Sequence, residues 1–245
     1  MMNFIKEIDR IIRLEDATLF QPELTGIVES DIDEWSLMID NALAEIGTGK
    51  LEKVVLARTI ELNFDGEISP SLVMENLSNQ QSNSFLFGIE HGQVAFVGAS
   101  PERLILKNGH NISTACVAGT IGRGESEYSD KMLENELLND SKNVNEHRFV
   151  VNYIRTVLEN KCLKLDIPSE PQILKNKNVQ HLYTPVNGIA LPEKSILDFV
   201  SDLHPTPAMG GMPHPLALQK IKALENFNRG FYASPLGWMD QFGNG

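Results

Sequence analysis

The sequence has no excess of basic residues. Its 245 residues include 21 Lys and Arg against 33 Asp and Glu, which gives a formal net charge of -12. Such a chain lacks the surplus cations that neutralise nucleic-acid phosphates or that attach a protein to an anionic membrane surface. It also has no apolar run long enough for a signal peptide or a membrane span. We therefore expect neither nucleic acid nor membrane as a partner, and an anionic ligand would need a few placed cations or a bound metal.

Cysteine is scarce, and the common phosphate-binding motifs are missing. The two cysteines, Cys116 and Cys162, form no C-x-x-C pair, so a zinc ribbon or a disulfide framework has no support. This usage favours the cytoplasm. Neither a G-x-G-x-x-G motif nor a Walker A loop occurs, which leaves nucleotide binding without support.

The apolar pattern predicts hairpins first, then helices, then further strands. Predicted helices cover residues 31–44, 69–77, 126–138, 142–159, 195–203 and 215–227. Predicted strands cover residues 53–62 and 179–186, with two hairpins turning at His91-Gly92 and Asn108-Gly109 and a strand pair at 229–242. Residues 163–178 are predicted to be an exposed connection. No βαβ alternation is present, so the pattern predicts an α+β protein with antiparallel sheets flanked by helices.

Two polar residues in apolar surroundings are candidates for acid–base chemistry. Lys53 begins an apolar strand, where it is either a solvated strand-end lysine or a general base whose proton is lost through burial. Glu102 follows Pro101 at the join between the two hairpins, and it is either a surface carboxylate or a general acid in an apolar pocket. The residues alone leave both alternatives open.

Glu146 begins the apolar stripe of the helix predicted at residues 142–159. A carboxylate near the start of a helix interacts favourably with the helix dipole, which is a sufficient reason for it to be there. The alternative is a Mg²⁺ ligand, because hard cations bind carboxylate oxygens.

A glycine-containing segment and two histidines are candidates for ligand binding. The segment at residues 116–124 presents backbone N–H groups around Gly119, next to the hydroxyl of Thr120. An ordinary loop is the equal alternative. His181 and His204 have no metal-ligand spacing, and each is either a core histidine or part of a pocket.

Seven ordered motifs together resemble one family. KVVLAR, GASPERL, AGT-x-x-RG, NEHR, VQHL, LHPTPA-x-GG and RGFY occur in the order of the chorismate-binding enzymes, whose members include isochorismate, salicylate, anthranilate and aminodeoxychorismate synthases. The resemblance runs from about Asp31 to the last residue. It implies the family's sandwich of antiparallel sheets flanked by helices, with residues 1–30 as a lead-in and residues 31–245 as a partial catalytic domain.

The resemblance also implies roles for individual residues. Lys53 corresponds to the base that activates water, Glu102 to the acid that protonates the departing hydroxyl, and Glu146 to a first Mg²⁺ ligand. Ala118 stands where aminodeoxychorismate synthases have a nucleophilic lysine. The residues that match substrate-contacting positions are Gly119, Thr120, His181, Thr206 and Tyr232.

The activity implied is that of an isomerase, isochorismate synthase, which converts chorismate to isochorismate with Mg²⁺ as cofactor. Three alternatives stay open: a salicylate synthase, an anthranilate synthase component I, and a non-catalytic paralogue that binds chorismate. The resemblance does not separate menaquinone from siderophore biosynthesis, and it gives no oligomeric state.

Family members continue beyond the position of Gly245. The expected continuation holds a further strand, an arginine that binds a substrate carboxylate, a glycine-rich loop and the remaining Mg²⁺-binding glutamates. We therefore expect a fragment with half a metal site, inactive or nearly inactive by itself.

Overall fold

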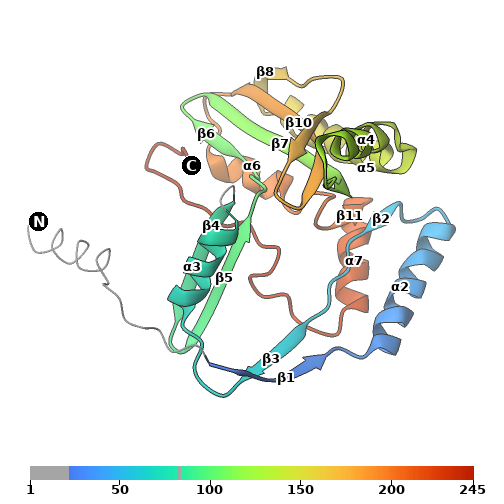
Figure 1. Ribbon diagram of the computed structural model, residues 1–245. Helices are drawn as coiled ribbons and strands as arrows, with labels where there is room; N and C mark the ends of the chain where they lie inside the picture. Colours follow the sequence, from blue (N-terminus) through green and yellow to red (C-terminus); the bar gives the residue numbers. More distant parts are fainter. Residues whose placement is uncertain (1–21, 82–83) are drawn as a thin grey trace, which may run out of the picture. The chain divides into compact units, whose positions relative to one another are not determined.

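The computed structural model describes residues 22–81 and 84–245, and its contacts divide the chain into two compact units. The described part of the first unit lies within Met1–Glu29 and Thr59–Ala99. The second unit takes Ser30–Arg58 and Ser100–Gly245. Figure 1 shows the helices and strands of both.

Among the described residues, the first unit has two strand pairs and one helix. Its elements are β1 (Leu24–Glu29), β3 (Ile60–Phe64), α3 (Pro70–Gln80), β4 (Phe85–His91) and β5 (Val94–Ser100), whose last residue falls in the second unit. Strand β1 pairs antiparallel with β3, and β4 pairs with β5 across the predicted turn at Gly92. Ser69 is the N-cap of α3, and its side chain accepts a hydrogen bond from the backbone N–H of Leu72. This helix and this hairpin are confirmed.

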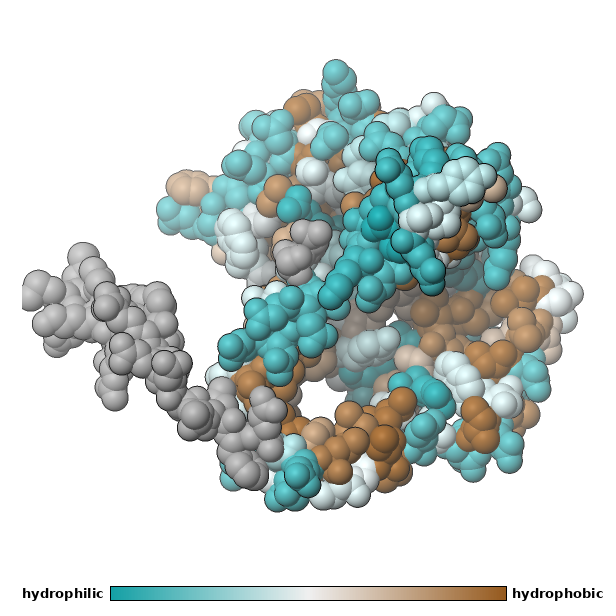
Figure 2. Space-filling model, viewed as in Figure 1, coloured by the Kyte–Doolittle hydropathy of each residue, from teal (hydrophilic) through white to brown (hydrophobic). Residues whose placement is uncertain are grey.

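None of the described residues in the first unit is fully buried. Large apolar side chains stay exposed on its strands, among them Ile27 (57%), Val28 (55%) and Leu62 (50%). Figure 2 shows these hydrophobic surfaces in brown over β1 and β3. The buried core of the described protein therefore lies in the second unit.

The second unit is built on an antiparallel sheet with the strand order β6-β7-β10-β8, and β9 also pairs with β10. The strands are β6 (Leu106–Asn108), β7 (Asn111–Gly122), β8 (Cys162–Asp166), β9 (Gln172–Lys175) and β10 (Val179–Ala190). The predicted turn at Asn108-Gly109 joins β6 to β7. The exposed connection predicted at residues 163–178 is wrong, because β8 and β9 both hydrogen-bond to β10 there.

Five helices accompany this sheet. They are α2 (Ile32–Gly47), α4 (Glu127–Asn139), α5 (Ser141–Glu159), α6 (Ile196–Leu203) and α7 (His214–Leu224), and each lies where a helix was predicted. Helix α5 packs against β7 with a stripe of buried residues at helical spacing: His147, Val150, Ile154 and Leu158. The combination of helices with antiparallel sheets confirms the predicted α+β class.

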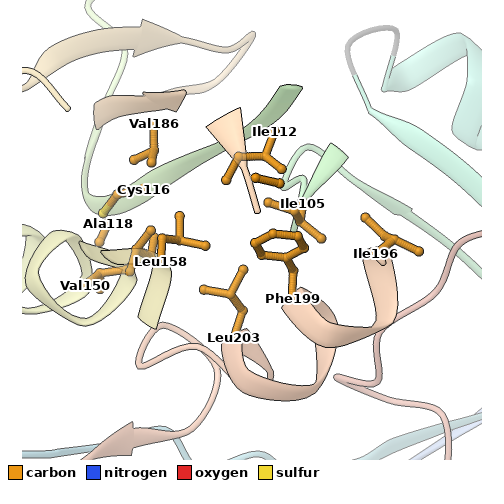
Figure 3. Packing of buried hydrophobic residues seen from close by; sticks show 12 residues of the cluster. Ile105, Ile112, Cys116, Ala118, Val150, Leu158, Val186, Ile196, Phe199 and Leu203 are labelled. Atoms are coloured by element: carbon orange, nitrogen blue, oxygen red, sulfur yellow. The ribbon is translucent and has the colours of Figure 1, made fainter. Parts of the chain in front are cut away.

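The core of the second unit lies between the sheet, α5 and α6 (Figure 3). Ile112 and Cys116 extend from β7, Leu158 from α5 and Phe199 from α6, and all are at most 2% exposed. None of the helices in the described part of the chain is long and apolar enough to span a membrane.

The strand predicted at residues 53–62 is wrong in extent. The predicted segment begins with the short strand β2 (Lys53–Val54), which does not continue into β3. Strand β2 pairs instead with β11 (Gly211–Met212). Gly211 has φ +137°, and a Cβ there would lie 2.2 Å from the carbonyl oxygen of Lys53. A glycine is thus required for the close approach of the two strands.

The strand pair predicted at residues 229–242 is also wrong. This segment runs through turns, with the N–H of Tyr232 donating to the carbonyl of Arg229 and that of Ser234 to Phe231. No strand is assigned within it, so the pattern of large apolar residues alone was misleading.

Candidate active site

Lys53 and Glu146 form an ion pair. The ammonium of Lys53 on β2 donates to Oε1 of Glu146 on α5 at 2.5 Å. The two side chains are 20% and 34% exposed, so the pair is partly shielded from water. The structure therefore brings the predicted base next to the predicted metal ligand.

Glu102 has the electrostatic character of an acid. Burial raises the pKa of its carboxyl, and the nearby charge of Lys53 lowers it again by a smaller amount. The backbone N–H of Glu102 donates to the hydroxyl of Ser100 at 3.2 Å, and this hydrogen bond holds the backbone at Glu102 in place. A carboxyl with a raised pKa keeps its proton at higher pH, as a proton donor requires.

The buried thiol of Cys116 on β7 is influenced by the charges of all three residues. Burial raises the pKa of Cys116, and the charges of Glu102 and Glu146 raise it further while Lys53 lowers it. All three charged groups are thus near one atom on β7. The predicted acid, base and metal ligand therefore all lie within electrostatic reach of one buried residue of β7.

Gly119 is the site of a β-bulge. His181 on β10 pairs with Thr120 on β7, and Tyr183 pairs with Val117. One residue lies between the two positions on β10 but two lie between them on β7, so β7 holds one extra residue. Gly119 has φ +83°, and a Cβ there would press against Asn143 and Leu182 at 3.2 Å. The bulge shifts the alternation of β7 by one, so Thr120 falls on the other face from Ala118.

Thr120 and His181 form a hydrogen-bonded pair, with 2.8 Å between Oγ1 of the threonine and Nδ1 of the histidine. His181 and Thr184 both lie on β10, and the hydroxyl of Thr184 bonds to His147 on α5. Because side chains alternate along a strand, His181 points to the face of the sheet opposite α5. Burial lowers the pKa of His181. In the described chain no hydrogen bond or ion pair joins this pair to Lys53.

Thr206 is buried in the loop before β11. Its carbonyl accepts from the N–H groups of Met209 and Gly210, and the carbonyl of Gly210 in turn accepts from Val55. Its hydroxyl oxygen Oγ1 is buried and has no protein partner in the described residues. Thr206 therefore belongs to the loop that holds the strand of Lys53, and it has a polar atom to spare.

Tyr232 lies in the turn segment and is 49% exposed. The guanidinium of Arg229 stacks over its ring at 5.8 Å, and the same guanidinium donates to the carbonyl of Val55 at 2.8 Å. Tyr232 is thus linked to the segment after Lys53 through Arg229. Its contact to a substrate stays a prediction.

Sequence reasoning missed two polar networks around these residues. Glu225, 3% exposed, accepts from the N–H of Ala57 and from Arg229, which fixes the chain beyond β2. His147, the residue after Glu146, is buried between α5 and the sheet. His147 stands three residues before Val150 and so shares its helix face, a signal that was available in the spacing.

His204, at the C-terminal end of α6, is not joined to the Lys53 site by any hydrogen bond or ion pair in the described residues. Burial lowers its pKa, and the neighbouring His214 lowers it further. The structure favours the interpretation of His204 as a half-buried structural histidine.

The described residues hold no group of three or more His, Cys, Asp or Glu side chains arranged for a metal ion. Glu146 is a single carboxylate. It fits Mg²⁺ as one ligand, because Mg²⁺ is usually bound by one or two protein carboxylates and keeps several waters or substrate oxygens.

The family model described as "Chorismate binding enzyme" matches residues 2–245. The chain belongs to the chorismate-binding enzymes. This confirms the resemblance that the seven motifs indicated.

Individual relatives narrow the comparison within the chorismate-binding enzymes. The isochorismate synthase MenF of Bacillus subtilis is 42% identical over 225 residues, which cover 92% of this chain and 48% of that protein. The salicylate biosynthesis isochorismate synthase of Pseudomonas aeruginosa is 41% identical over 212 residues, 86% of this chain and 44% of its own length. The chain thus spans about half the length of these relatives.

Solved structures agree with the fold. MenF, the menaquinone-specific isochorismate synthase of Escherichia coli, superposes with a TM-score of 0.81 at 29% identity, covering 92% of this chain and 53% of that one. Anthranilate synthase component I of Streptococcus pneumoniae gives a TM-score of 0.83 at 23% identity over 99% of this chain and 55% of the other. The second similarity concerns the fold alone.

Proposed function

We propose that this chain carries the acid–base pair and the first metal ligand of an isochorismate synthase, a Mg²⁺-dependent isomerase that converts chorismate to isochorismate. The observations that carry the proposal are the ion pair between Lys53 and Glu146 and the position of Glu102, which is close enough for the charge of Lys53 to act on its carboxyl. Relatives named isochorismate synthase, at 42% and 41% identity, support the choice of reaction.

In the proposed reaction, Lys53 takes a proton from a water molecule whose oxygen bonds to C2 of the chorismate ring. The ring double bonds shift and the C4–O bond breaks. Glu102 gives its proton to the departing hydroxyl, which leaves as water. The raised pKa of Glu102 supports its role as the donor.

Lys53 can accept a proton only as a free amine. In the ion pair with Glu146 the side chain of Lys53 is the hydrogen-bond donor, so as an ammonium it would have to lose a proton before it could act as the base. When bound, Mg²⁺ would supply positive charge to the ring carboxylate of chorismate, with Glu146 as its protein ligand.

We further propose that Gly119, Thr120, His181, Thr206 and Tyr232 contact chorismate. The unpartnered hydroxyl of Thr206 supports this, because a buried polar atom without a partner is rare and costs free energy until a ligand satisfies it. The bulge at Gly119 leaves Thr120 exposed, where a ligand can reach it.

We propose the cytoplasm as the location, which the two free cysteines support, since thiols stay reduced there. We also propose that the 245-residue chain alone turns over little or no chorismate. Its span of about half the length of its relatives supports this.

The test uses the chain alone and a chimera in which it replaces the matched 225-residue segment of the Bacillus subtilis relative. With chorismate and Mg²⁺, the chimera is expected to form isochorismate, and the chain alone almost none. Lys53→Ala in the chimera should abolish the product. Salicylate with pyruvate, or ammonia-dependent anthranilate, would replace the proposed reaction by that of the corresponding synthase.

A folded chimera that binds chorismate without forming any product, next to an active parent enzyme, would favour a non-catalytic paralogue. Measurable isochorismate from the 245-residue chain would overturn the proposed inactivity and leave the proposed reaction standing.

A further inference from the structure

His147 is a buried imidazole that the proposed reaction does not use. It lies on α5, is 3% exposed, and follows Glu146 in the sequence. Both of its ring nitrogens meet the sheet. Nδ1 lies 3.0 Å from the carbonyl oxygen of Ala118 on β7, and Nε2 lies 2.8 Å from the hydroxyl of Thr184 on β10.

These partners fix the tautomer. A carbonyl oxygen can only accept, so Nδ1 of His147 carries the proton and donates it to Ala118. Nε2 then accepts from the hydroxyl of Thr184, and both ring nitrogens are satisfied.

Ala118 is the residue at which β7 changes its alternation. Ala118 and Gly119 together lie opposite the single residue Leu182 of β10. Thr120 is the next residue along β7. The carbonyl that His147 holds therefore belongs to the bulge itself. Bulges lack the regular ladder bonds of a strand pair, so a side-chain donor at this point fixes a conformation that the ladder alone does not.

We propose that His147 is a positioning residue that fixes the β7 bulge and so turns Thr120 toward His181. His147 is adjacent to Glu146 on α5. Its hydrogen bond to Ala118 therefore connects the Thr120–His181 pair to the helix that carries the predicted metal ligand. That the pair serves chorismate rests on the proposed function, whereas the link from helix to bulge does not.

The competing explanation is that His147 only fills space. Two substitutions separate the explanations. Asparagine places its side-chain NH₂ where Nδ1 stands and can still donate to Ala118, whereas leucine fills the site without a donor. A purely packing role predicts that leucine does at least as well as asparagine, and a positioning role predicts the reverse.

The first measurement is NMR on the ¹⁵N-labelled 245-residue chain. We expect Nδ1 of His147 to be protonated and Nε2 to be bare. In His147→Leu, amide exchange at Thr120 and His181 should be about tenfold faster or more, as for the loss of one buried hydrogen bond. In His147→Asn it should stay within about threefold of the wild type.

Thr184→Val is the matched control, because it removes the other hydrogen bond of the same imidazole and leaves the bond to Ala118. Exchange at Thr120 should be unchanged in it. Should His147→Leu fail to fold, His147→Gln gives the same comparison, since its amide can reach Thr184 but not Ala118. A protonated Nε2, or equal exchange in the Asn variant and in the Leu or Gln variant, would overturn the proposal.

The functional measurement uses the chimera. His147→Leu should raise KM for chorismate about tenfold with kcat changed less than threefold, and His147→Asn should keep both near the parent values. If the NMR link holds but KM does not move, the assignment of Thr120 and His181 to chorismate fails and the link stands.

Discussion

The ammonium of Lys53 and the carboxylate of Glu146 lie 2.5 Å apart, although 93 residues separate them in the sequence. One residue comes from the two-residue strand β2 and the other from helix α5. The predicted base and the predicted metal ligand are thus direct neighbours, so a substitution at one removes an ion-pair partner of the other.

Replacing Glu146 by glutamine should weaken Mg²⁺ binding by about 100-fold or more while changing stability by only about 1 kcal/mol. The pair is partly exposed, so breaking it has little effect on folding, whereas Mg²⁺ loses a charged ligand. Calorimetric Mg²⁺ titration of the chimera and thermal unfolding of the 245-residue chain measure the two effects. Glu159→Gln on the same helix is the control and should change neither. Unaltered Mg²⁺ affinity in Glu146→Gln would remove this residue from the metal site.

Glu102→Gln should lower kcat of the chimera by about 10²–10⁴-fold, the usual contribution of a general acid. Because burial raises the pKa of Glu102, the parent should lose activity with rising pH at a higher pH than an ordinary carboxyl would allow. The limb of the pH–rate profile assigned to this acid should vanish in the variant. Glu125→Gln, an exposed carboxylate in the same unit, should leave the profile as it is.

Glu102→Gln should raise stability at neutral pH although it lowers activity. A carboxyl whose pKa is raised in the folded state makes folding less favourable as the pH rises above its unfolded pKa, near 4.5. Glu102→Gln removes this loss, so the variant should unfold at a higher temperature than the wild type at pH 7. At pH 3 the two should unfold together. Equal midpoints at both pH values would contradict the raised pKa.

The sequence predicted the helices, the two hairpins and the α+β class, because each depends on local spacing and turn residues. It did not predict where the strand of Lys53 ends. That end is set by Gly210, whose carbonyl accepts from Val55, and by Glu225, which accepts from Ala57. These partners lie more than 150 residues further along the chain, and no local pattern reveals them.

The candidate site shows the same limit. Motifs indicated Lys53, Glu102 and Glu146 one by one, and the contact between Lys53 on β2 and Glu146 on α5 exists only in the folded chain. The bulge at Gly119 was invisible, because a bulge is defined only against the register of a partner strand. The partners of His147 lie on β7 and β10, so the spacing along α5 could indicate that it is buried but not what it binds.

Gly211→Ala should displace the strand of Lys53. The new methyl group would lie 2.2 Å from the carbonyl of Lys53 at a φ of +137°, so both crowding and backbone strain oppose it. We expect about 3 kcal/mol of lost stability, measured by urea unfolding. Gly47→Ala, where no atom lies within 4 Å of the new methyl group, is the matched control and should change stability by less than about 1 kcal/mol.

Asp130→Asn should destabilise the chain at neutral pH but not in acid. The hydrogen bond from the Arg123 side chain, then those from Lys175 and the N–H of Gly124, hold the pKa of Asp130 far below its usual value of 3.8. A lowered folded pKa adds stability that is fully present above pH 3.8 and is lost as the pH falls through the folded pKa. Thermal unfolding at pH 7 should therefore show a lower midpoint for Asp130→Asn, and the gap to the wild type should narrow steadily below pH 3.8. Glu127→Gln, an exposed carboxylate in the first turn of the same helix, should show no such pH-dependent gap. A gap that stays constant from pH 7 to pH 2 would mean that Asp130 acts through its shape and hydrogen bonds rather than through its charge.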